Sequence, residues 1–532
     1  MNFRFTQTPY SKTGYFSKMV TDYLAAAAPL QPFYTHATSI EGLRGAMKNR
    51  AAFSTNRALL VQELKKQYEG IGIPPKLQQN IDLLLSENTF TITTAHQPNI
   101  FTGHLYFIYK IMHAIRLAEW LTEQEPAFHF VPVFYMGSED ADLEELGHVY
   151  INGVKHEWKT DQTGAVGRMK VDKALTGLLN IIEGEIAVQP YGKDIIGLMK
   201  SCYTIGVTIE EATFNMVNAL FGEYGLLVLL PDNATLKRSF NPIVQKELLE
   251  AFSHKAVEEA VTAIPAEYKV QAGGRELNLF YLIDDKRERI EKKNDRFTVV
   301  NTPWSFTGKE ILKELDEHPE RFSANVILRP VFQELVLPNV AFIGGGGEIA
   351  YWLELKKVFA AVEIPFPALV LRNSFLLVEE KYRELAVKTG FAIPELFQTA
   401  DELLTQLTKR DSKRQLSLVT EKETLRSFYS ALKQTAGAVD SSLAKHTDAL
   451  HKKAMDKIEA LEKKMLRAEK KKFEAQQRQL HKLKEGLFPH NNLQERIENF
   501  MPFYGKWGRQ LIDALYHHSL SLEQEFVILE EA

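Results

Sequence analysis

The sequence has one cysteine, Cys202, in 532 residues. A single thiol cannot form a disulfide within the chain, and a Cys-x-x-Cys metal site is excluded for the same reason. Cys202 stands in LMKSCYTIGV, without the surroundings of a known catalytic cysteine. We therefore expect it to be a small, buried residue. We predict no metal ligands from the sequence.

Long apolar runs are also missing. No segment approaches the roughly 18 residues of a membrane span, and the first residues, MNFRFTQTPYSKTGYF, contain no apolar core of a secretory signal. We expect a cytoplasmic protein that does not bind membranes.

An excess of positive charge is absent too. Lys and Arg total 64 and Asp and Glu total 68, for a net charge of −4. A dedicated nucleic-acid-binding protein would be strongly basic, so we expect no nucleic-acid partner. Hydrophobic residues (45%) and charged residues (25%) are in ordinary globular proportion, and the length exceeds that of one simple domain.

Proline and glycine are scarce near the end of the chain. Residues 376–532 hold 3 of the 21 prolines and 5 of the 30 glycines. Turn-rich structure therefore belongs to residues 1–375, and residues 376–532 are predicted to be helical.

Residues 1–375 show the pattern of a parallel sheet. A short β-branched run at 90–94 is followed by apolar residues at helical spacing from Leu105 to Ala118, and then by an apolar run at 128–136. Strand, crossover helix and strand form a βαβ unit. Further strands are expected at 226–230 and 366–371. The predicted fold class is α/β, with a Rossmann-like core.

A connective insertion is predicted at about 149–300. Asn152-Gly153 indicates a hairpin, residues 194–222 are typical of a helix, and residues 277–301 favour a second hairpin that turns at 293–295.

The C-terminal domain carries a coiled-coil pattern. Residues 451–485 contain 12 Lys or Arg and 6 Asp or Glu. A thin apolar stripe with nearly heptad spacing needs a partner, either an antiparallel helix at about 419–446, a second copy of the chain, or both. The stripe consists of Leu450, Ala454, Ile458, Leu461, Met465 and Ala468.

The first candidate site is His96-Gln97-Pro98-Asn99-Ile100-Phe101-Thr102-Gly103, between a strand and a helix. Ligands of open α/β sheets bind beyond the carboxyl ends of strands. Thr102 is a candidate helix cap, and Tyr106 and Lys110 share one helical face. The segment is either a phosphate or carboxylate pocket with Lys110 as counter-charge, or a capped surface helix.

The second candidate segment is acidic and follows the strand at 128–136. It contains Glu139, Asp140, Asp142, Glu144, Glu145 and His148. These carboxylates either bind an ammonium group, a hydroxyl or Mg²⁺ and accept a proton, or complement the dipole of a first helical turn.

The third candidate segment is a glycine run, Gly344 to Gly347, followed by Glu348 and Tyr351. It is either an anion-binding loop at a helix start or a plain strand-to-helix turn. Two arginines in apolar surroundings, Arg329 and Arg372, must pair with a carboxylate or bind substrate.

Together these segments resemble the bacillithiol biosynthesis cysteine-adding enzyme family, also described as cysteine ligases. The matching segments are TTAHQPNIFTGHLYFIYK, VPVFYMGSEDADLEELGHV, NVILRPVFQELVLPNVAFIGGGGEIAYWLELK, FPALVLRNS and LFPHNNLQERIENF. They extend from about residue 91 to 500, so the resemblance covers nearly the whole chain. Three features depart from the family pattern: His104 replaces a usual proline, Ala141 replaces a usual histidine, and the glycine run lacks the proline that it often includes.

The resemblance implies a Rossmann-like core with inserted segments and a coiled-coil domain that forms a homodimer. It implies addition of cysteine to glucosaminyl malate as the last step of bacillithiol biosynthesis, with an adenine nucleotide near the coiled coil. Amide formation from a free carboxylate is unfavourable in water, which also favours ATP, accompanied by Mg²⁺. Two alternatives stay open: a nucleotidyl transferase on the same fold, and a non-enzymatic coiled-coil binding module.

Three sets of site residues follow from these arguments. The catalytic candidates are Lys110, Glu139, Asp140 and Asp142. The substrate-binding candidates are His96, Gln97, Thr102, Gly103, Tyr106, His148, Arg329, Gly344, Gly345, Glu348 and Tyr351. The candidates for nucleotide binding, implied by the resemblance, are Gln494, Glu495 and Arg496.

Overall fold

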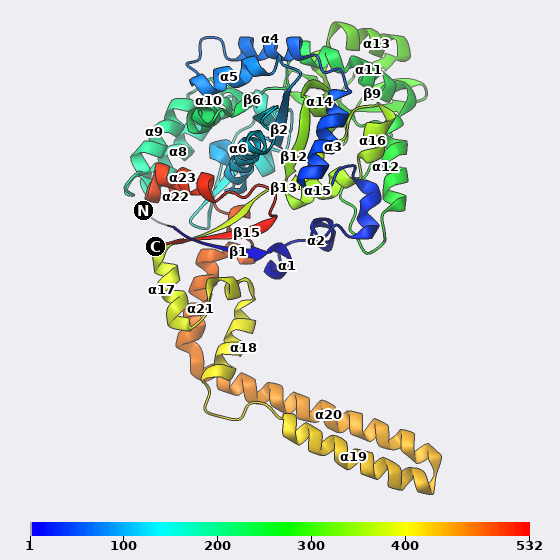
Figure 1. Ribbon diagram of the computed structural model, residues 1–532, viewed down its shortest axis with the longest axis vertical. Helices are drawn as coiled ribbons and strands as arrows, with labels where there is room; N and C mark the ends of the chain where they lie inside the picture. Colours follow the sequence, from blue (N-terminus) through cyan, green and yellow to red (C-terminus); the bar gives the residue numbers. More distant parts are fainter. Residues whose placement is uncertain (1–2) are drawn as a thin grey trace. The chain divides into compact units, whose positions relative to one another are not determined.

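The computed structural model describes residues 3–532 (Figure 1). Two compact units divide the chain. The first runs to Leu377 and takes up residues 492–530 again, and the second comprises Val378–Asn491. The helical domain predicted at 376–532 thus differs from the second unit at its end, because the chain after Asn491 packs with the first unit.

A five-stranded parallel sheet forms the centre of the first unit. Its order is β13 (Ala368–Leu371), β12 (Asn339–Gly344), β2 (Thr89–His96), β3 (His129–Met136) and β6 (Leu227–Leu229). When the five strands are numbered by their sequence in the chain, their order across the sheet is 5-4-1-2-3. This is a Rossmann-like order, and its topological switch point, where the order of the strands reverses, lies between β2 and β12. All four predicted strands are present, and the Rossmann-like α/β fold class is confirmed.

Helix α6 (Tyr106–Gln124) connects β2 to β3 and packs on the sheet. Apolar side chains from β2, β12, β13 and α6 form one buried cluster with helix α3 (Ile40–Ala51). Because this cluster fixes the sheet and α6 together, it sets where the loops at the carboxyl ends of the strands lie.

The region predicted as an insertion contributes β6 to the parallel sheet, so the inserted residues fall into two stretches. The first contains the predicted hairpin, β4 (His148–Ile151) with β5 (Val154–Glu157). The helical stretch predicted at 194–222 is present as two helices, α9 (Gly192–Cys202) and α10 (Ile209–Phe221). They are separate because Gly206 has a φ of 93° and Thr208 caps α10.

The second stretch forms an antiparallel sheet, in the order β10-β9-β8-β7-β11. The predicted turn at 293–295 is present, with Asn294 and Asp295 both at positive φ. The strands are β7 (Leu279–Ile283), β8 (Lys286–Lys293), β9 (Arg296–Val299), β10 (Ser305–Thr307) and β11 (Phe322–Ala324). A third sheet has the order β1-β15-β14, with β1 at Phe3–Pro9, β14 at Ser374–Val378 and β15 at Glu525–Glu531.

The second unit is helical, and its coiled-coil pattern is confirmed as an antiparallel pair of α19 (Val419–Val439) and α20 (Ser441–Lys470). Ion pairs such as Lys422–Glu462, at 2.6 Å, join the two helices. The seam is rotated from the predicted one, because Leu450 and Leu461 stay 42% and 49% exposed. The other helices of this unit are α17 (Glu380–Thr389), α18 (Ala400–Asp411) and α21 (Glu474–Leu487).

Within residues 3–532, no helix combines the length and the apolar character that crossing a membrane requires. Cys202 is buried, as expected.

Candidate functional site

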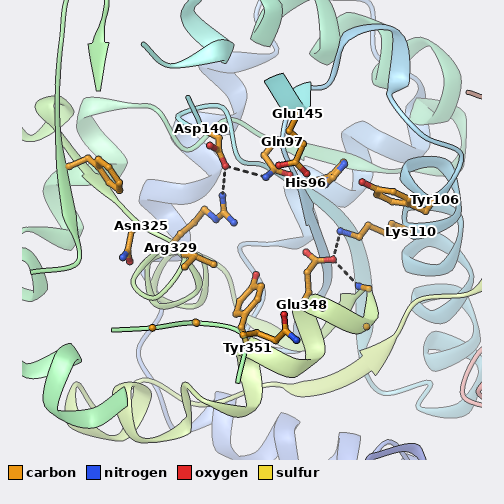
Figure 2. A pocket seen from close by; sticks show the side chains of 18 of the residues that line it. His96, Gln97, Tyr106, Lys110, Asp140, Glu145, Asn325, Arg329, Glu348 and Tyr351 are labelled. Carbon is orange, nitrogen blue, oxygen red and sulfur yellow. Dashed lines mark hydrogen bonds and ion pairs between the residues drawn. The ribbon is translucent and has the colours of Figure 1, made fainter. Parts of the chain in front are cut away.

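A cavity of about 800 Å³ opens at the carboxyl ends of β2 and β12, at the switch point of the parallel sheet. Its walls come from the loop after β2, from α6, from the loop after β3, from the antiparallel sheet and from the glycine run (Figure 2). Ligand cavities of proteins commonly have this size and this place in the fold.

Lys110 lies at the inner wall of the cavity and is almost fully buried. Its Nζ donates a hydrogen bond of 2.9 Å to the carbonyl oxygen of Ala95 and forms an ion pair with Glu348. Burial lowers the pKa of Lys110, and the Glu348 carboxylate opposes this shift. Lys110 is therefore held as a positive charge by one carboxylate at the cavity surface.

Glu348 belongs to the start of helix α15 (Gly346–Leu353). Its Oε2 accepts a hydrogen bond of 2.8 Å from the backbone N–H of Gly345, so it caps the helix and pairs with Lys110 at the same time (Figure 2). The glycine run thus serves as a strand-to-helix turn whose first helical N–H groups face a positively charged cavity.

Asp140 occupies the opposite side of the cavity. Its Oδ2 accepts a hydrogen bond of 3.1 Å from Gln97 Nε2 and lies 3.9 Å from Arg329 Nη1 (Figure 2). Burial opposes ionisation of Asp140, but Arg329 and Gln97 outweigh it and hold the pKa of this carboxyl below its usual range. Asp140 is consequently ionised at neutral pH.

Glu145 is a cavity residue that was not among the sequence-based site candidates. Burial raises its pKa, and the nearby carboxylates Asp142 and Asp140 raise it further. The pKa of Asp140 is therefore lowered, whereas that of Glu145 is raised. Glu145 is consequently the better proton acceptor of the two. The signal in the sequence was its place in the acidic segment, where five acids could not be ranked by spacing alone.

Two buried nitrogen atoms in the cavity wall have no hydrogen-bond partner within residues 3–532. They are His96 Nε2 and Arg372 Nε. Burial and the neighbouring cations, first Lys110, hold the pKa of His96 well below its usual value, so its ring is neutral. Buried polar groups are normally satisfied, so these two atoms are left to be satisfied by water or by a ligand.

The cavity has an excess of positive charge. Three carboxylates, Asp140, Glu145 and Glu348, face seven cations. The cations are Lys110, Arg275, Arg287, Arg289, Arg329, Arg372 and Arg496. Since unpaired charges are costly in a partly buried site, such a cavity favours an anionic ligand.

The structure brings ten of the eighteen predicted site residues to this one cavity. They are His96, Gln97, Tyr106, Lys110, Asp140, Arg329, Gly345, Glu348, Tyr351 and Arg496. Their roles in binding or catalysis stay predictions.

Thr102 and Gly103 do not line the cavity. The idea that Thr102 caps the helix is wrong, because α6 begins at Tyr106 and Thr102 has a φ of 74°. Instead, Asn499 Nδ2 donates hydrogen bonds to Thr102 Oγ1 and to the carbonyl oxygens of Phe101 and Gly103, at 3.2, 2.7 and 2.6 Å. These residues hold the turn before α6 in place.

Three members of the acidic segment do not line the cavity either and have their contacts elsewhere. Glu139 forms an ion pair with the buried Lys237. Asp142 caps a short helix by accepting a hydrogen bond from the backbone N–H of Glu145, and His148 Nδ1 bonds to the carbonyl oxygen of Glu144.

Gly344 and two of the nucleotide candidates are likewise outside the cavity wall. Gly344 is the last residue of β12, where a Cβ atom would lie 2.8 Å from the Phe342 ring. Gln494 bonds to the backbone of Leu377, and the buried Glu495 pairs with Arg372 at 2.7 Å. The contacts of these three residues are internal to the protein and stabilise its fold.

Fold and cavity together define a Rossmann-like α/β protein with a cavity rich in cationic side chains at the switch point and an added α-helical hairpin. The bacillithiol biosynthesis BshC N-terminal Rossmann-like domain matches residues 3–373, and the BshC C-terminal coiled-coil domain matches residues 375–531. The chain therefore belongs to the bacillithiol biosynthesis BshC family, which confirms the resemblance found in the sequence.

Curated relatives cover almost the whole chain. A protein of Flavobacterium johnsoniae named "Putative cysteine ligase BshC" is 40% identical over 522 residues, 98% of each chain. The protein of the same name from Flavobacterium psychrophilum is also 40% identical, over 98% of this chain and 99% of the relative. That of Cytophaga hutchinsonii is 38% identical over 94% of each.

Proposed function

We propose that the protein is a ligase that joins the carboxyl group of cysteine to the amine of glucosaminyl malate, as the last step of bacillithiol biosynthesis. The observation that carries this proposal is the cationic cavity at the switch point, with the unpartnered His96 Nε2 and Arg372 Nε in its wall. The family and the names of its curated members support a cysteine ligase. The malyl group and a nucleotide are both anionic and would fit such a cavity.

ATP would supply the free energy for activating the cysteine carboxyl group. Lys110, Arg496 and the first N–H groups of α15 are suited to hold phosphate oxygens, since phosphoryl chemistry is catalysed mainly by positioning and by positive charge. Within residues 3–532, no three His, Cys, Asp or Glu side chains gather as they would around a metal ion. Mg²⁺ would therefore be held largely by the phosphates.

The cavity carboxylates would bind the amine of the acceptor and accept its proton. An amine must be neutral to attack a carboxyl carbon, so a base has to remove its proton. Asp140, with its lowered pKa, suits electrostatic binding of the ammonium form. Glu145, with its raised pKa, suits acceptance of the proton. His96 is neutral and offers Nε2 as a further contact for substrate.

The exposed apolar side chains of the α19–α20 hairpin support a homodimer. Phe428, Leu432 and Leu461 are 58%, 41% and 49% exposed, although soluble surfaces rarely gather large apolar groups on one helical element. A second copy of the same hairpin would cover them, and the chain would then act as a homodimer in the cytoplasm.

The proposed reaction is tested by mass spectrometry of purified protein with cysteine, glucosaminyl malate and Mg-ATP, each omitted in turn. We expect an amide product that requires all components. Lys110→Ala should lower kcat/KM by about 10²–10³-fold, as loss of a charge-stabilising group does. Lys313→Ala, which removes a lysine 73% exposed on helix α13 (Gly308–Glu317), is the control and should retain activity.

Two outcomes contradict the proposal. Release of AMP or pyrophosphate without an amide product would support the nucleotidyl transferase alternative. If no product forms with any nucleotide, the protein has this fold but acts on a different substrate.

A further inference from the structure

Arg287, on strand β8, reaches the cavity from the antiparallel sheet. Its guanidinium lies over the Phe280 ring, 3.9 Å from the centroid. Nε donates a hydrogen bond of 3.1 Å to Ser323 Oγ, and Nη2 donates one of 3.3 Å to the carbonyl oxygen of Ala324. The side chain is thus fixed in one orientation before any ligand arrives.

All protein partners of Arg287 are neutral. Within residues 3–532, no carboxylate comes within ion-pair distance of it, although arginine has five donors and a full charge. The two nearest acids are already engaged, because Glu139 pairs with Lys237 and Asp140 with Gln97 and Arg329. A fixed, half-buried cation without a carboxylate in direct contact favours an anion from outside.

The cations of the cavity fall into two groups. Figure 2 shows Arg329 with Asp140 on one side and Lys110 on the other, with Glu348 between them. The Lys110 side combines a compact ammonium with helix N–H groups, which suits phosphate. The Arg287–Arg329 side presents guanidinium groups. Arg289 of strand β8 and Arg275, in the segment before β7, line the same cavity. Two guanidinium groups can each hold one carboxylate in a forked pair.

We propose that Arg287 and Arg329 form a dicarboxylate subsite, which selects the malyl group of the acceptor through its two carboxylates. This inference rests on the proposed function for the identity of the acceptor. Arg287 acts as a specificity-determining residue. The antiparallel sheet is then more than a connection, because it supplies the wall that recognises the acid end of the substrate.

The test is isothermal titration calorimetry of the full chain with L-malate, with L-lactate, which lacks the second carboxylate, and with inorganic phosphate, all at constant ionic strength. We expect malate to bind more tightly than lactate. Arg287→Gln should weaken malate binding by about 10- to 100-fold, the effect of losing one charge-assisted hydrogen-bonded pair. The matched control, Lys286→Gln, removes the same charge one position earlier on the strand, from an exposed residue, and should bind malate unchanged.

Arg287→Lys controls for a folding defect, because lysine retains the positive charge and loses only the paired N–H donors of the guanidinium group. It should bind malate with an intermediate affinity, about tenfold weaker than the original protein. Unchanged malate binding by Arg287→Gln, equal affinities for malate and lactate, or no malate binding at all would overturn the subsite. An equal loss of phosphate and malate binding would overturn its selectivity for dicarboxylates. Malate binding that depends on Arg287 without any ligase product would retain the subsite and refute the proposed function.

Discussion

At Glu495, the role expected from the sequence and the contacts in the structure differ most clearly. The resemblance implies a nucleotide contact, whereas the structure gives this carboxylate three internal hydrogen bonds. Oε1 accepts hydrogen bonds from Arg372 Nη2 at 2.7 Å and from Ser374 Oγ at 3.0 Å, and Oε2 accepts one from the backbone N–H of Phe375 at 3.3 Å. Both members of the ion pair are buried, with side-chain exposures of 4% for Arg372 and 0% for Glu495. We therefore predict that Glu495→Ala acts first on stability.

The magnitude follows from this geometry. Removing one partner of a buried ion pair leaves the other charge uncompensated and costs about 3–5 kcal/mol. Arg372 would be left in this state, since its Nε already lacks a partner. Arg496→Ala is the contrasting variant, because Arg496 lines the cavity and should change the free energy of unfolding by about 1 kcal/mol or less.

The assay is urea denaturation followed by circular dichroism, together with calorimetric titration of ATP. We expect Glu495→Ala to lose about 3–5 kcal/mol of unfolding free energy. Replacing the pair together, with Arg372→Met and Glu495→Leu, should recover most of that loss, since apolar residues can replace a buried pair at little cost. A Glu495→Ala protein of unchanged stability that fails to bind ATP would refute the reasoning and restore Glu495 to the nucleotide site.

Three further predictions concern catalysis, pH and assembly. Glu145→Gln should lower kcat by about 10²–10⁴-fold, as expected for a lost general base, whereas Glu144→Gln should retain activity; equal kcat values for both variants would contradict this role. Burial raises the pKa of Glu498 from 4.5 to about 7, so its contribution to stability is complete below about pH 4.5 and is lost as the pH rises through 7. Glu498→Gln should therefore be more stable than the original protein at about pH 9, by up to about 3 kcal/mol, and similar at about pH 4.5 in urea denaturation; equal curves at both pH values would refute this. Phe428→Asp should shift sedimentation from dimer to monomer, while Val387→Asp, at a position 74% exposed on α17, should not, and a dimer that survives Phe428→Asp would contradict the proposed interface.

Local signals predicted the elements of the fold well. The strand at 90–94, the helix after Leu105 and the Asn152-Gly153 turn depend on residues that are close in sequence, and all three are present. The break between α9 and α10 was missed, although Gly206 followed by the capping residue Thr208 could have indicated it.

Long-range partners were beyond the reach of such signals. Thr102 and Gly103 looked like a binding loop, but their partner Asn499 lies nearly 400 positions later in the chain. Arg287 was overlooked because a strand arginine is ordinarily a surface residue, and only the pairing of β8 with β7 brings it to the cavity.

The ion pair between Lys110 and Glu348 joins the buried lysine of the cavity to the start of α15. Glu348 neutralises Lys110, which would otherwise be a buried, unpaired cation. Glu348 also caps α15 through the backbone N–H of Gly345, so it can release Lys110 and keep a partner. An incoming phosphate would compete for Lys110 and for the first N–H groups of α15 together, since the same helix start presents both. The glycine run therefore matters less as a flexible loop than as the place where a helix start, a carboxylate and a lysine meet.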